Sequence, residues 1–249
     1  MQDIGQVVIK NHISYFPCNQ DGRDFVVGDI HGEFDMVKNA LHIVEFDPIK
    51  DRLFCTGDLI DRGEDSVDVL EFLDQPFVYS VIGDHDFHFA SKKIKDLRDI
   101  SQQLDGIGLY WVNRISDQEI LKIQNRFKQL PYVIEIQTRF GLIGIVHADV
   151  PKGMTWLDFK EGIQSMDAET SITCLEGRDR SSSGDCSGVS GIFRLFAGHT
   201  VHWDGPRRLG NVFLIDTGAV HRRQNNKGSL TILNILCDAN DMTVATLKQ

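Results

Sequence analysis

The amino-acid sequence predicts a mixed α/β to α+β fold that forms a single domain over residues 1–249. Three observations predict it. The first half of the chain alternates short apolar runs with amphipathic stretches, which is typical of parallel strands joined by helices. The second half contains several short apolar runs, which are typical of strands that pair in antiparallel fashion. Short motifs rich in Asp, His and Gly follow several of these runs directly.

The first half of the chain is predicted to contain three strands, each followed by a helix. The helical segments carry apolar residues at a spacing of three to four, whereas the strands are short and almost wholly apolar. In chain order, the strands are residues 25–27, 52–56 and 77–82, and the helices are residues 34–46, 66–73 and 84 to about 100. In open sheets of this kind, ligands bind beyond the carboxyl ends of the strands. The motifs at these ends therefore predict a functional site.

The second half is predicted to begin with an inserted cap, because residues from about 101 to 130 have a helical but irregular pattern. Candidate anchors of the cap are Trp111, Leu121, Ile123 and Phe127, and Trp156 and Trp203 are predicted to be further core or cap anchors. After the cap, residues 132–136 and 141–146 are predicted to form one antiparallel pair, residues 193–197 and 212–215 a second, and residues 230–236 and 243–247 the closing strands. Residues from about 151 to 190 are interpreted only as a polar stretch.

The charge balance of the chain argues against some classes of partner. Twenty-six Lys and Arg residues stand against thirty-six Asp and Glu residues, so the net charge is −10. We therefore expect neither nucleic acid nor an anionic membrane as the default partner. An anionic substrate would need local positive charge, and bound divalent cations could supply it.

The chain carries no recognisable targeting or membrane signal. No segment approaches the roughly 18 to 20 consecutive apolar residues of a membrane span, and no basic region followed by an apolar run stands at the N-terminus. The five cysteines are odd in number and form no CxxC pair, so neither a disulfide framework nor a zinc knuckle is indicated. We expect a cytoplasmic protein whose oligomeric state the sequence does not indicate.

The motifs that follow the apolar runs combine carboxylates and imidazoles with glycine. In chain order they are Gly28-Asp29-Ile30-His31-Gly32, Gly57-Asp58-Leu59-Ile60-Asp61-Arg62-Gly63, Gly83-Asp84-His85-Asp86, His147-Ala148-Asp149 and Gly198-His199-Thr200. Borderline-hard divalent metals prefer mixed oxygen and nitrogen ligands of this kind. Taken singly, each motif also fits a helix N-cap or a surface pair. Five such placements in one chain favour a metal cluster and hydrolytic chemistry on phosphate.

Four residues of these motifs have side chains suited to particular roles in such chemistry. Asp58 has two carboxylate oxygens and can bridge two metal ions about 3.5 to 4 Å apart. Arg62 offers a planar fork of donors that matches phosphate oxygens, and Asp61 is placed to orient a neighbouring histidine. His85, with an unperturbed pKa near 6.5, is suited to donate a proton to a leaving alkoxide.

The motif series resembles the phosphoprotein phosphatase family of metallophosphoesterases, and within it the bacterial and phage lambda-type serine/threonine protein phosphatases. The segments that carry the resemblance are GDIHGEFD, GDLIDRGEDS, GDHD, HADVP, AGHT and Ile215-Asp216-Thr217-Gly218-Ala219, over about residues 24 to 236. The resemblance implies the four-layer metallophosphoesterase fold, with a central β-sandwich flanked by helices and a helical cap insertion. It also implies two divalent metal ions, commonly Mn²⁺, with Fe or Zn as other possible ions.

The resemblance further implies a role for each matching residue. Asp29 and His31 would bind the first metal, Asp58 would bridge both, and the second metal would take Asp84, His147 and His199. Members of the family hydrolyse phosphomonoesters by in-line attack of a metal-bridging hydroxide. His85 would protonate the leaving oxygen, Asp61 would hold His85, and Arg62 would bind the phosphate of a phosphorylated protein or peptide. Arg178 matches a further phosphate-binding arginine across a loop of different length, with Arg180 as its near substitute.

Two departures from the family pattern keep other functions open. Asp84 stands where the family has a neutral asparagine, which adds a negative charge near the site and suggests attenuated turnover. Ile82 stands where these phosphatases usually have an arginine, and the surrounding segment resembles the symmetrical diadenosine tetraphosphate hydrolases. Besides a serine/threonine protein phosphatase, the sequence therefore allows a symmetrical dinucleoside tetraphosphate hydrolase or a phosphatase-fold protein that binds without turnover.

Overall fold

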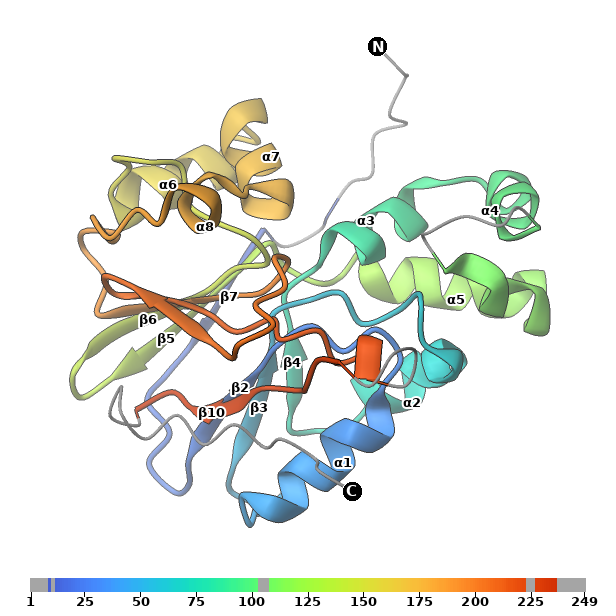
Figure 1. Ribbon diagram of the computed structural model, residues 1–249, viewed down its shortest axis with the longest axis horizontal. Helices are drawn as coiled ribbons and strands as arrows, with labels where there is room; N and C mark the ends of the chain where they lie inside the picture. The colour runs from blue at the N-terminus through green and yellow to red at the C-terminus, as the bar shows by residue number, and fades with distance from the viewer. Residues whose placement is uncertain (1–8, 10–11, 103–107, 223–226, 237–249) are drawn as a thin grey trace.

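Two β-sheets pack face to face in the computed structural model, which describes residues 9, 12–102, 108–222 and 227–236 (Figure 1). The large sheet has the strand order β1-β5-β6-β7-β9-β8 and the small sheet the order β10-β2-β3-β4. The strands are β1 (Ile13–Phe16), β2 (Asp24–Val27), β3 (Arg52–Cys55), β4 (Val78–Ser80), β5 (Val133–Thr138), β6 (Gly141–Ile145), β7 (Arg194–Ala197), β8 (Arg207–Leu209), β9 (Val212–Leu214) and β10 (Ile232–Asn234). The predicted sandwich of mixed α/β type is therefore confirmed.

Side-chain alternation along the strands explains why both faces of each sheet are covered. Val26 and Phe54 point into the core between the sheets, whereas their neighbours Val27 and Cys55 belong to the core on the helical side. The core between the sheets consists of Val26, Phe54, Val81, Ile134, Ile136, Ile143, Ile145, Phe196, Phe213, Ile215, Leu233 and Ile235. Since both faces are apolar, the strands are near-continuous hydrophobic runs, which is why the sequence reveals them.

Helices flank the two sheets. In Figure 1, α1 lies below and to the right of the small sheet and α2 lies to its right, α3, α4 and α5 lie to the upper right, and α6, α7 and α8 lie above the large sheet. Their bounds are α1 (Phe34–Ile43), α2 (Val69–Leu73), α3 (Asp84–Ser91), α4 (Ile94–Ser101), α5 (Asp117–Phe127), α6 (Trp156–Gln164), α7 (Ala168–Glu176) and α8 (Asp179–Ser183), with 3₁₀ turns η1 (Glu64–Asp68) and η2 (Leu109–Arg114). The helix predicted from 84 to about 100 is thus two helices.

Each sheet brings three parallel strands side by side. In the small sheet, β2, β3 and β4 are parallel neighbours, and Cys55 pairs with both Val27 and Ser80. In the large sheet, β6, β7 and β9 are parallel neighbours in the same way. Because the carboxyl ends of parallel neighbours meet at one edge, the motifs that follow these strands converge.

The predicted antiparallel pairing of residues 193–197 with 212–215 is wrong, because β7 and β9 are parallel. The short strand β8 forms the antiparallel hairpin with β9 instead, across a turn at Gly210 that has a φ of 65°. The sequence did not predict β8, since exposed Arg207 and Arg208 lack the apolar pattern of a strand. By contrast, the predicted pairing of residues 132–136 with 141–146 is confirmed by β5 and β6.

The polar stretch from 151 to 190 folds into three helices that the sequence interpretation missed. Trp156, Phe159 and Ile163 are buried on one face of α6, and the Thr155 hydroxyl accepts a hydrogen bond from the Asp158 amide at its N-terminus. These helices form the crossover that parallel strands β6 and β7 require. Strand β1 was missed as well.

Two of the predicted anchors are not buried. Trp111, Ile123 and Phe127 lie in the core as expected, but Leu121 and Trp203 are 47% and 53% exposed. The strand predicted over residues 243–247 and part of the predicted cap, residues 103–107, lie outside the described residues.

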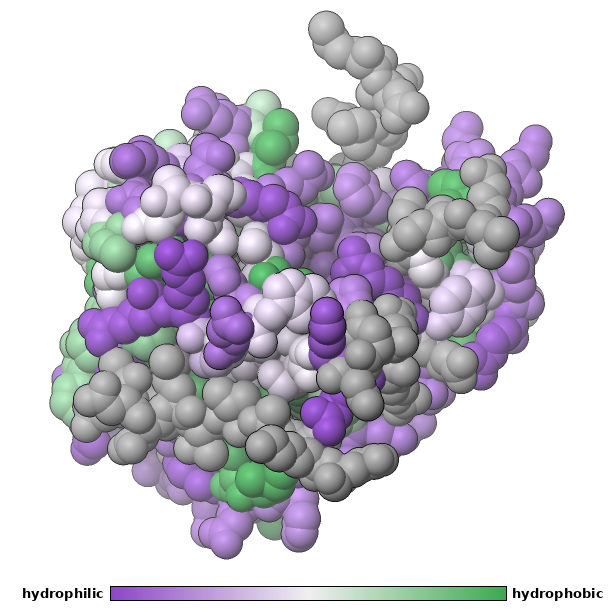
Figure 2. All heavy atoms as spheres, in the orientation of Figure 1, coloured by the Kyte–Doolittle hydropathy of each residue, from purple (hydrophilic) through white to green (hydrophobic). Residues whose placement is uncertain are grey.

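The surface has the character expected of a chain that buries most of its apolar residues. The face shown in Figure 2 is largely hydrophilic, and its hydrophobic residues form small separate patches. Among the described residues, no helix combines the length and the apolar composition that crossing a membrane requires.

Candidate metal centre

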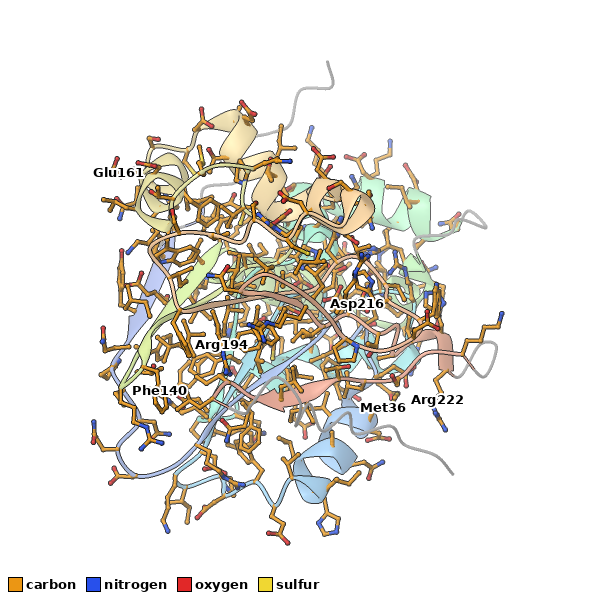
Figure 3. All side chains as sticks on the ribbon, turned by 60° about the vertical axis from the view of Figure 1, so that its left-hand side comes forward. Met36, Phe140, Glu161, Arg194, Asp216 and Arg222 are labelled. Atoms are coloured by element: carbon orange, nitrogen blue, oxygen red, sulfur yellow. The ribbon has the colours of Figure 1, made fainter. Side chains whose placement is uncertain are left out.

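The carboxyl ends of the parallel strands in both sheets carry the predicted site residues. Asp29 and His31 follow β2, Asp58 follows β3, and Asp84 and His85 begin α3 just after β4. From the large sheet, His147 follows β6 and His199 follows β7. Figure 3 shows Asp216, which follows β9, among packed side chains in the interior, away from labelled surface residues such as Phe140 and Arg222.

Four of these side chains form one possible metal-binding group. The candidate ligand atoms of Asp58, Asp84, His147 and His199 all lie within 4.8 Å of one another. Asp84 Oδ1 lies 3.1 Å from His147 Nε2 and 3.4 Å from His199 Nδ1, and the two nitrogens are 3.2 Å apart. Ligands of a single divalent cation at about 2.0–2.2 Å lie about 3 Å from one another, so these three atoms fit a shared ion.

Asp58 belongs also to a second possible group. The candidate ligand atoms of His31, Asp58 and His85 lie within 4.8 Å of one another. Asp58 Oδ2 is 3.4 Å from His31 Nε2, whereas Asp58 Oδ1 is 3.5 Å from His147 Nε2. The two oxygens of one carboxylate therefore face the two groups, which is the arrangement that a bridging ligand requires.

Asp29 is not part of either group. It is buried, and its carboxylate accepts hydrogen bonds from the Thr56 hydroxyl at 2.9 Å and from the His199 amide at 2.8 Å. Burial and the neighbouring Asp216 raise the pKa of Asp29 well above its usual value. The structure thus brings together His31, Asp58 and His85, whereas the sequence interpretation assigned Asp29 with His31.

Backbone acceptors fix the orientation of two imidazoles. His31 Nδ1 lies 2.8 Å from the Ile60 carbonyl, and His147 Nδ1 lies 2.8 Å from the Thr56 carbonyl. A carbonyl oxygen can only accept, so Nδ1 carries the proton and donates it. In the neutral ring this leaves the Nε2 lone pair facing the cluster, which is the form that binds metals.

The electrostatics of the cluster also fit bound cations. Burial raises the pKa of Asp58 to about 7, with the nearby Asp84 adding to the effect. Burial also raises the pKa of Asp84, but hydrogen bonds to His147 and His199 outweigh it and lower the pKa below the usual value. His147 behaves in the opposite sense: burial lowers its pKa, while Asp58 and Asp84 raise it well above normal. In the absence of cations, protons held by groups with raised pKa values offset the negative charge of the crowded carboxylates.

His85 forms a chain of hydrogen bonds with Asp61 and Trp111. His85 Nδ1 is 2.8 Å from Asp61 Oδ2, and Trp111 Nε1 donates to Asp61 Oδ1 at 2.8 Å. Burial lowers the pKa of His85, but the neighbouring Asp58 and Asp61 outweigh it and raise the pKa to about 9. His85 is therefore a protonated imidazole near neutral pH, with its other nitrogen available to a ligand.

Arginines lie beside both groups. Arg62 Nη1 is 2.7 Å from His31 Nε2. Arg178 donates to Thr200 Oγ1 at 3.2 Å and to the His199 carbonyl at 3.4 Å. Arg180 is 3% exposed and donates to Asp149 Oδ1 at 2.8 Å. Of the two arginines that the sequence offered for a further phosphate contact, only Arg178 lies near the cluster with an exposed side chain, whereas Arg180 holds a buried carboxylate.

Backbone strain is concentrated at this edge. Seven described non-glycine residues have a positive φ, and five of them are site residues, namely His31, Asp58, Asp61, Arg62 and His199. Such conformations cost about 1–3 kcal/mol each and persist where the surrounding structure enforces them. Gly198 permits one close approach, because a Cβ at this position would lie 1.9 Å from Asp29 Oδ1.

Several residues that shape the site were not assigned a role from the sequence. Trp111 was expected only to be a cap anchor, and Asp216 was noted without a function. Asp86 is buried and accepts hydrogen bonds from the Leu59 and Gly83 amides, so it joins two motif loops. Asp86 is the third residue of α3, a position from which a carboxylate can accept a hydrogen bond from the N-cap amide, so its place is a helix-start signal that the sequence does contain. Ile82 is fully buried in the apolar core.

Comparison with known proteins identifies relatives over most of the chain. The family model of the calcineurin-like phosphoesterases matches residues 25–214. Serine/threonine-protein phosphatase 2 of Escherichia coli is 31% identical over 211 residues, which cover 85% of this chain and 92% of that protein. Serine/threonine-protein phosphatase 1 of Salmonella typhimurium is 32% identical over 220 residues, covering 85% and 91%. A symmetrical bis(5'-nucleosyl)-tetraphosphatase of Actinobacillus succinogenes is 44% identical over 78 residues, or 28% of each chain.

Solved structures share the fold at lower identity. A crystal structure of a candidate diadenosine tetraphosphatase superposes with a TM-score of 0.62 at 22% identity, covering 89% of this chain and 92% of that one. A serine/threonine phosphatase from Saccharomyces cerevisiae gives a TM-score of 0.60 at 17% identity, covering 92% and 79%. At these identities the likeness concerns the fold alone.

Proposed function

This chain belongs to the calcineurin-like phosphoesterase family, and we propose that within it the protein is a metal-dependent serine/threonine protein phosphatase. Its class is that of a phosphoric monoester hydrolase. The observation that carries the finer proposal is the length of the match: the relatives that cover 85% of the chain are serine/threonine phosphatases, whereas the symmetrical tetraphosphatases that match cover between 27% and 51% of it. The cytoplasm remains the predicted compartment.

The two groups that share Asp58 would hold two divalent ions, for which Mn²⁺ is our first candidate. One ion would use Asp84, His147 and His199, and the other His31, with Asp58 common to both. Asp29, as the sequence resemblance implies, would join His31 at that ion through a remaining lone pair of its carboxylate, since each of its oxygens accepts only one of the hydrogen bonds described above. Bound cations offset the carboxylate charge, attract phosphate and make a water molecule easier to deprotonate.

The arginines and His85 would act on the substrate itself. The lone pair of His31 Nε2 cannot serve both Arg62 and a metal ion, so a metal on His31 frees the Arg62 guanidinium for phosphate oxygens. Arg178, beside His199, would supply a second set of donors. His85 would pass its proton to the leaving oxygen, with Asp61 holding the imidazole in the orientation that this requires.

A turnover panel on metal-analysed protein tests this proposal. Phosphoserine and phosphothreonine peptides, a phosphotyrosine peptide, p-nitrophenyl phosphate and diadenosine tetraphosphate would be compared with Mn²⁺ present. We expect the phosphoserine or phosphothreonine peptides to give the highest kcat/KM, a chelator to abolish their hydrolysis, and His85→Asn to lower its rate by about 10²–10⁴-fold. Phosphopeptide binding without any turnover would contradict the proposal and favour a binding protein.

A second candidate function is symmetrical hydrolysis of dinucleoside tetraphosphates. The 44% identity to a symmetrical tetraphosphatase over 78 residues favours it. So does Ile82, which is buried in the core and supplies no additional phosphate contact. Two equivalents of ADP from diadenosine tetraphosphate, at a kcat/KM above that for every phosphopeptide, would establish this function instead.

A further inference from the structure

One segment of the predicted cap contacts the loop that carries Asp61 and Arg62. Three hydrogen bonds connect them. Trp111 Nε1 donates to Asp61 Oδ1 at 2.8 Å, the Arg62 amide donates to the Gly108 carbonyl at 3.0 Å, and the Tyr110 hydroxyl donates to the Arg62 carbonyl at 2.8 Å. Asp61 and Arg62 have positive φ values of 72° and 67°, so these bonds hold a strained loop.

Trp111 also contacts the helix that carries His85. Its ring stacks on Phe89 of α3, with centroids 5.2 Å apart and planes 20° apart. Phe127 of α5 packs edge-on against the same phenylalanine, with centroids 6.0 Å apart. Trp111 is fully buried, so its indole has one orientation. Trp111 therefore packs against the helix that carries His85 and donates a hydrogen bond to Asp61.

The hydrogen bond to Trp111 determines how Asp61 meets His85. With Oδ1 engaged by the indole, Oδ2 is the oxygen that faces His85 Nδ1 at 2.8 Å. Asp61 is 2% exposed, so water does not substitute for the indole donor. Without that donor, Oδ1 would be a buried acceptor with no partner and the carboxylate could rotate.

We propose that Trp111 is a positioning residue for His85, acting through Asp61. This inference rests on the proposed function, because it assumes that His85 protonates a leaving group. In that step an oxygen from water forms a bond to phosphorus, the bond between phosphorus and the leaving oxygen breaks, and a proton moves from His85 Nε2 to the leaving oxygen. A serine alkoxide needs this proton, whereas p-nitrophenolate leaves readily without it.

The test compares Trp111→Phe with Trp156→Phe. Trp156 is a matched control, since it is also a buried tryptophan that donates to a carboxylate, Glu135, at 2.6 Å. For each variant, kcat with Mn²⁺ would be measured on a phosphoserine peptide and on p-nitrophenyl phosphate. General acid catalysis contributes about 10²–10⁴-fold, so we expect Trp111→Phe to lower kcat on the peptide about 10-fold or more. We expect the change on p-nitrophenyl phosphate to be about threefold at most, and Trp156→Phe to leave the ratio of the two rates unchanged.

The ratio is measured within one protein preparation, so a partial loss of folded protein cancels. If Trp111→Phe does not fold, Trp111→Tyr takes its place in the same measurement. His85→Asn removes the proposed proton donor, so the change in its ratio of the two rates is the largest that loss of proton donation can cause. The inference would be overturned if the ratio of the two rates in Trp111→Phe equalled that of the parent while the ratio in His85→Asn differed from it.

A readout without turnover separates this inference from the proposed function. The proton on His85 Nδ1, hydrogen-bonded to Asp61, should give a downfield NMR signal in the parent and in Trp156→Phe. We expect that signal to shift or broaden in Trp111→Phe, while Mn²⁺ affinity by calorimetry changes less than about threefold. A parent that hydrolyses neither substrate would refute the proposed function, whereas an unchanged signal in Trp111→Phe would refute the positioning role.

Discussion

Asp84 shows how one residue can tune a site. It lies between two imidazole nitrogens, at 3.1 and 3.4 Å, and hydrogen bonds to them outweigh burial and keep its pKa below the usual value. Asp84 is therefore ionised near neutral pH. Two unit charges about 4 Å apart interact by about 4 kcal/mol at an effective dielectric near 20, an upper figure once cations screen them. An incoming phosphate meets this extra charge.

Replacing Asp84 with the neutral asparagine should therefore raise turnover and weaken metal binding. We expect Asp84→Asn to increase kcat about 10-fold with saturating Mn²⁺ and to raise the Mn²⁺ concentration needed for half-maximal activity. Steady-state kinetics over a manganese titration measures both. Asp35→Asn, an isosteric change at an exposed position of α1, is the control and should change neither. An unchanged or lower kcat in Asp84→Asn would show that the carboxylate does not attenuate the site.

The raised pKa of His85 links the stability of the metal-free protein to pH. Burial opposes the charged imidazole, but Asp58 and Asp61 raise the pKa from 6.5 to about 9. The folded state thus binds the proton more tightly than the unfolded state. The resulting stability is complete below pH 6.5 and is lost as pH rises through about 9.

Thermal melts in chelator measure this effect. We expect the parent to lose on the order of 1–3 kcal/mol of unfolding free energy between pH 6.5 and 9. His85→Asn should lose less over the same interval, although it keeps the contribution of His147. Equal losses in the two proteins would mean that His85 is not the group that titrates.

At the scale of the elements, α8 and the loop before it hold two arginines in different environments. Arg178 is exposed beside His199, whereas Arg180 is buried and pairs with Asp149. Burial raises the pKa of Asp149, and the pairing with Arg180 opposes that rise. Although the two arginines are two residues apart in sequence, Arg178 belongs to the candidate site and Arg180 to the core.

The two arginines should therefore respond differently to truncation. Arg180→Ala leaves Asp149 buried without its cation, and we expect it to lower stability by about 3 kcal/mol. Arg178→Ala should change stability by less than about 0.5 kcal/mol but raise KM for phosphopeptides about 10-fold. Urea melts and steady-state kinetics on both variants distinguish them. An unfolding free energy of Arg180→Ala equal to that of the parent would contradict the stabilising role of Arg180.

At the scale of the whole molecule, the candidate metal centre exists only because two sheets pack together. Asp58 and Asp84 come from the small sheet, and His147 and His199 from the large one. A cation bound by all four would connect the two halves of the sandwich. Metal binding to the folded state alone stabilises it by mass action.

Metal removal should consequently lower thermal stability. At 100 times its dissociation constant, a ligand adds about 2.7 kcal/mol, which corresponds to roughly 5–10 °C for a chain of this length. We expect Mn²⁺ to raise the melting temperature of the chelated protein by this amount. Because Asp58 belongs to both groups, Asp58→Asn should lose most of the increment. If Mn²⁺ raised the melting temperature of Asp58→Asn as much as that of the parent, the stabilising ions would bind at another site.

The sequence by itself determined the strands of the small sheet and the residues that gather at their ends. Apolar runs buried on both faces, followed by glycine and a carboxylate or imidazole, are local signals that need no tertiary information. It also indicated Asp58, His85 and Arg62 through the chemistry of their side chains.

Tertiary structure alone decided the parallel pairing of β7 with β9 and the hydrogen bonds of Asp29. It also decided the separation of Arg178 from Arg180 and the bond from Trp111 to Asp61. Each of these depends on partners brought together across the fold, and Trp111 and Asp61 are 50 residues apart. Side-chain identity and local periodicity carry no record of such distant neighbours, which only the packing of the sheets and helices specifies.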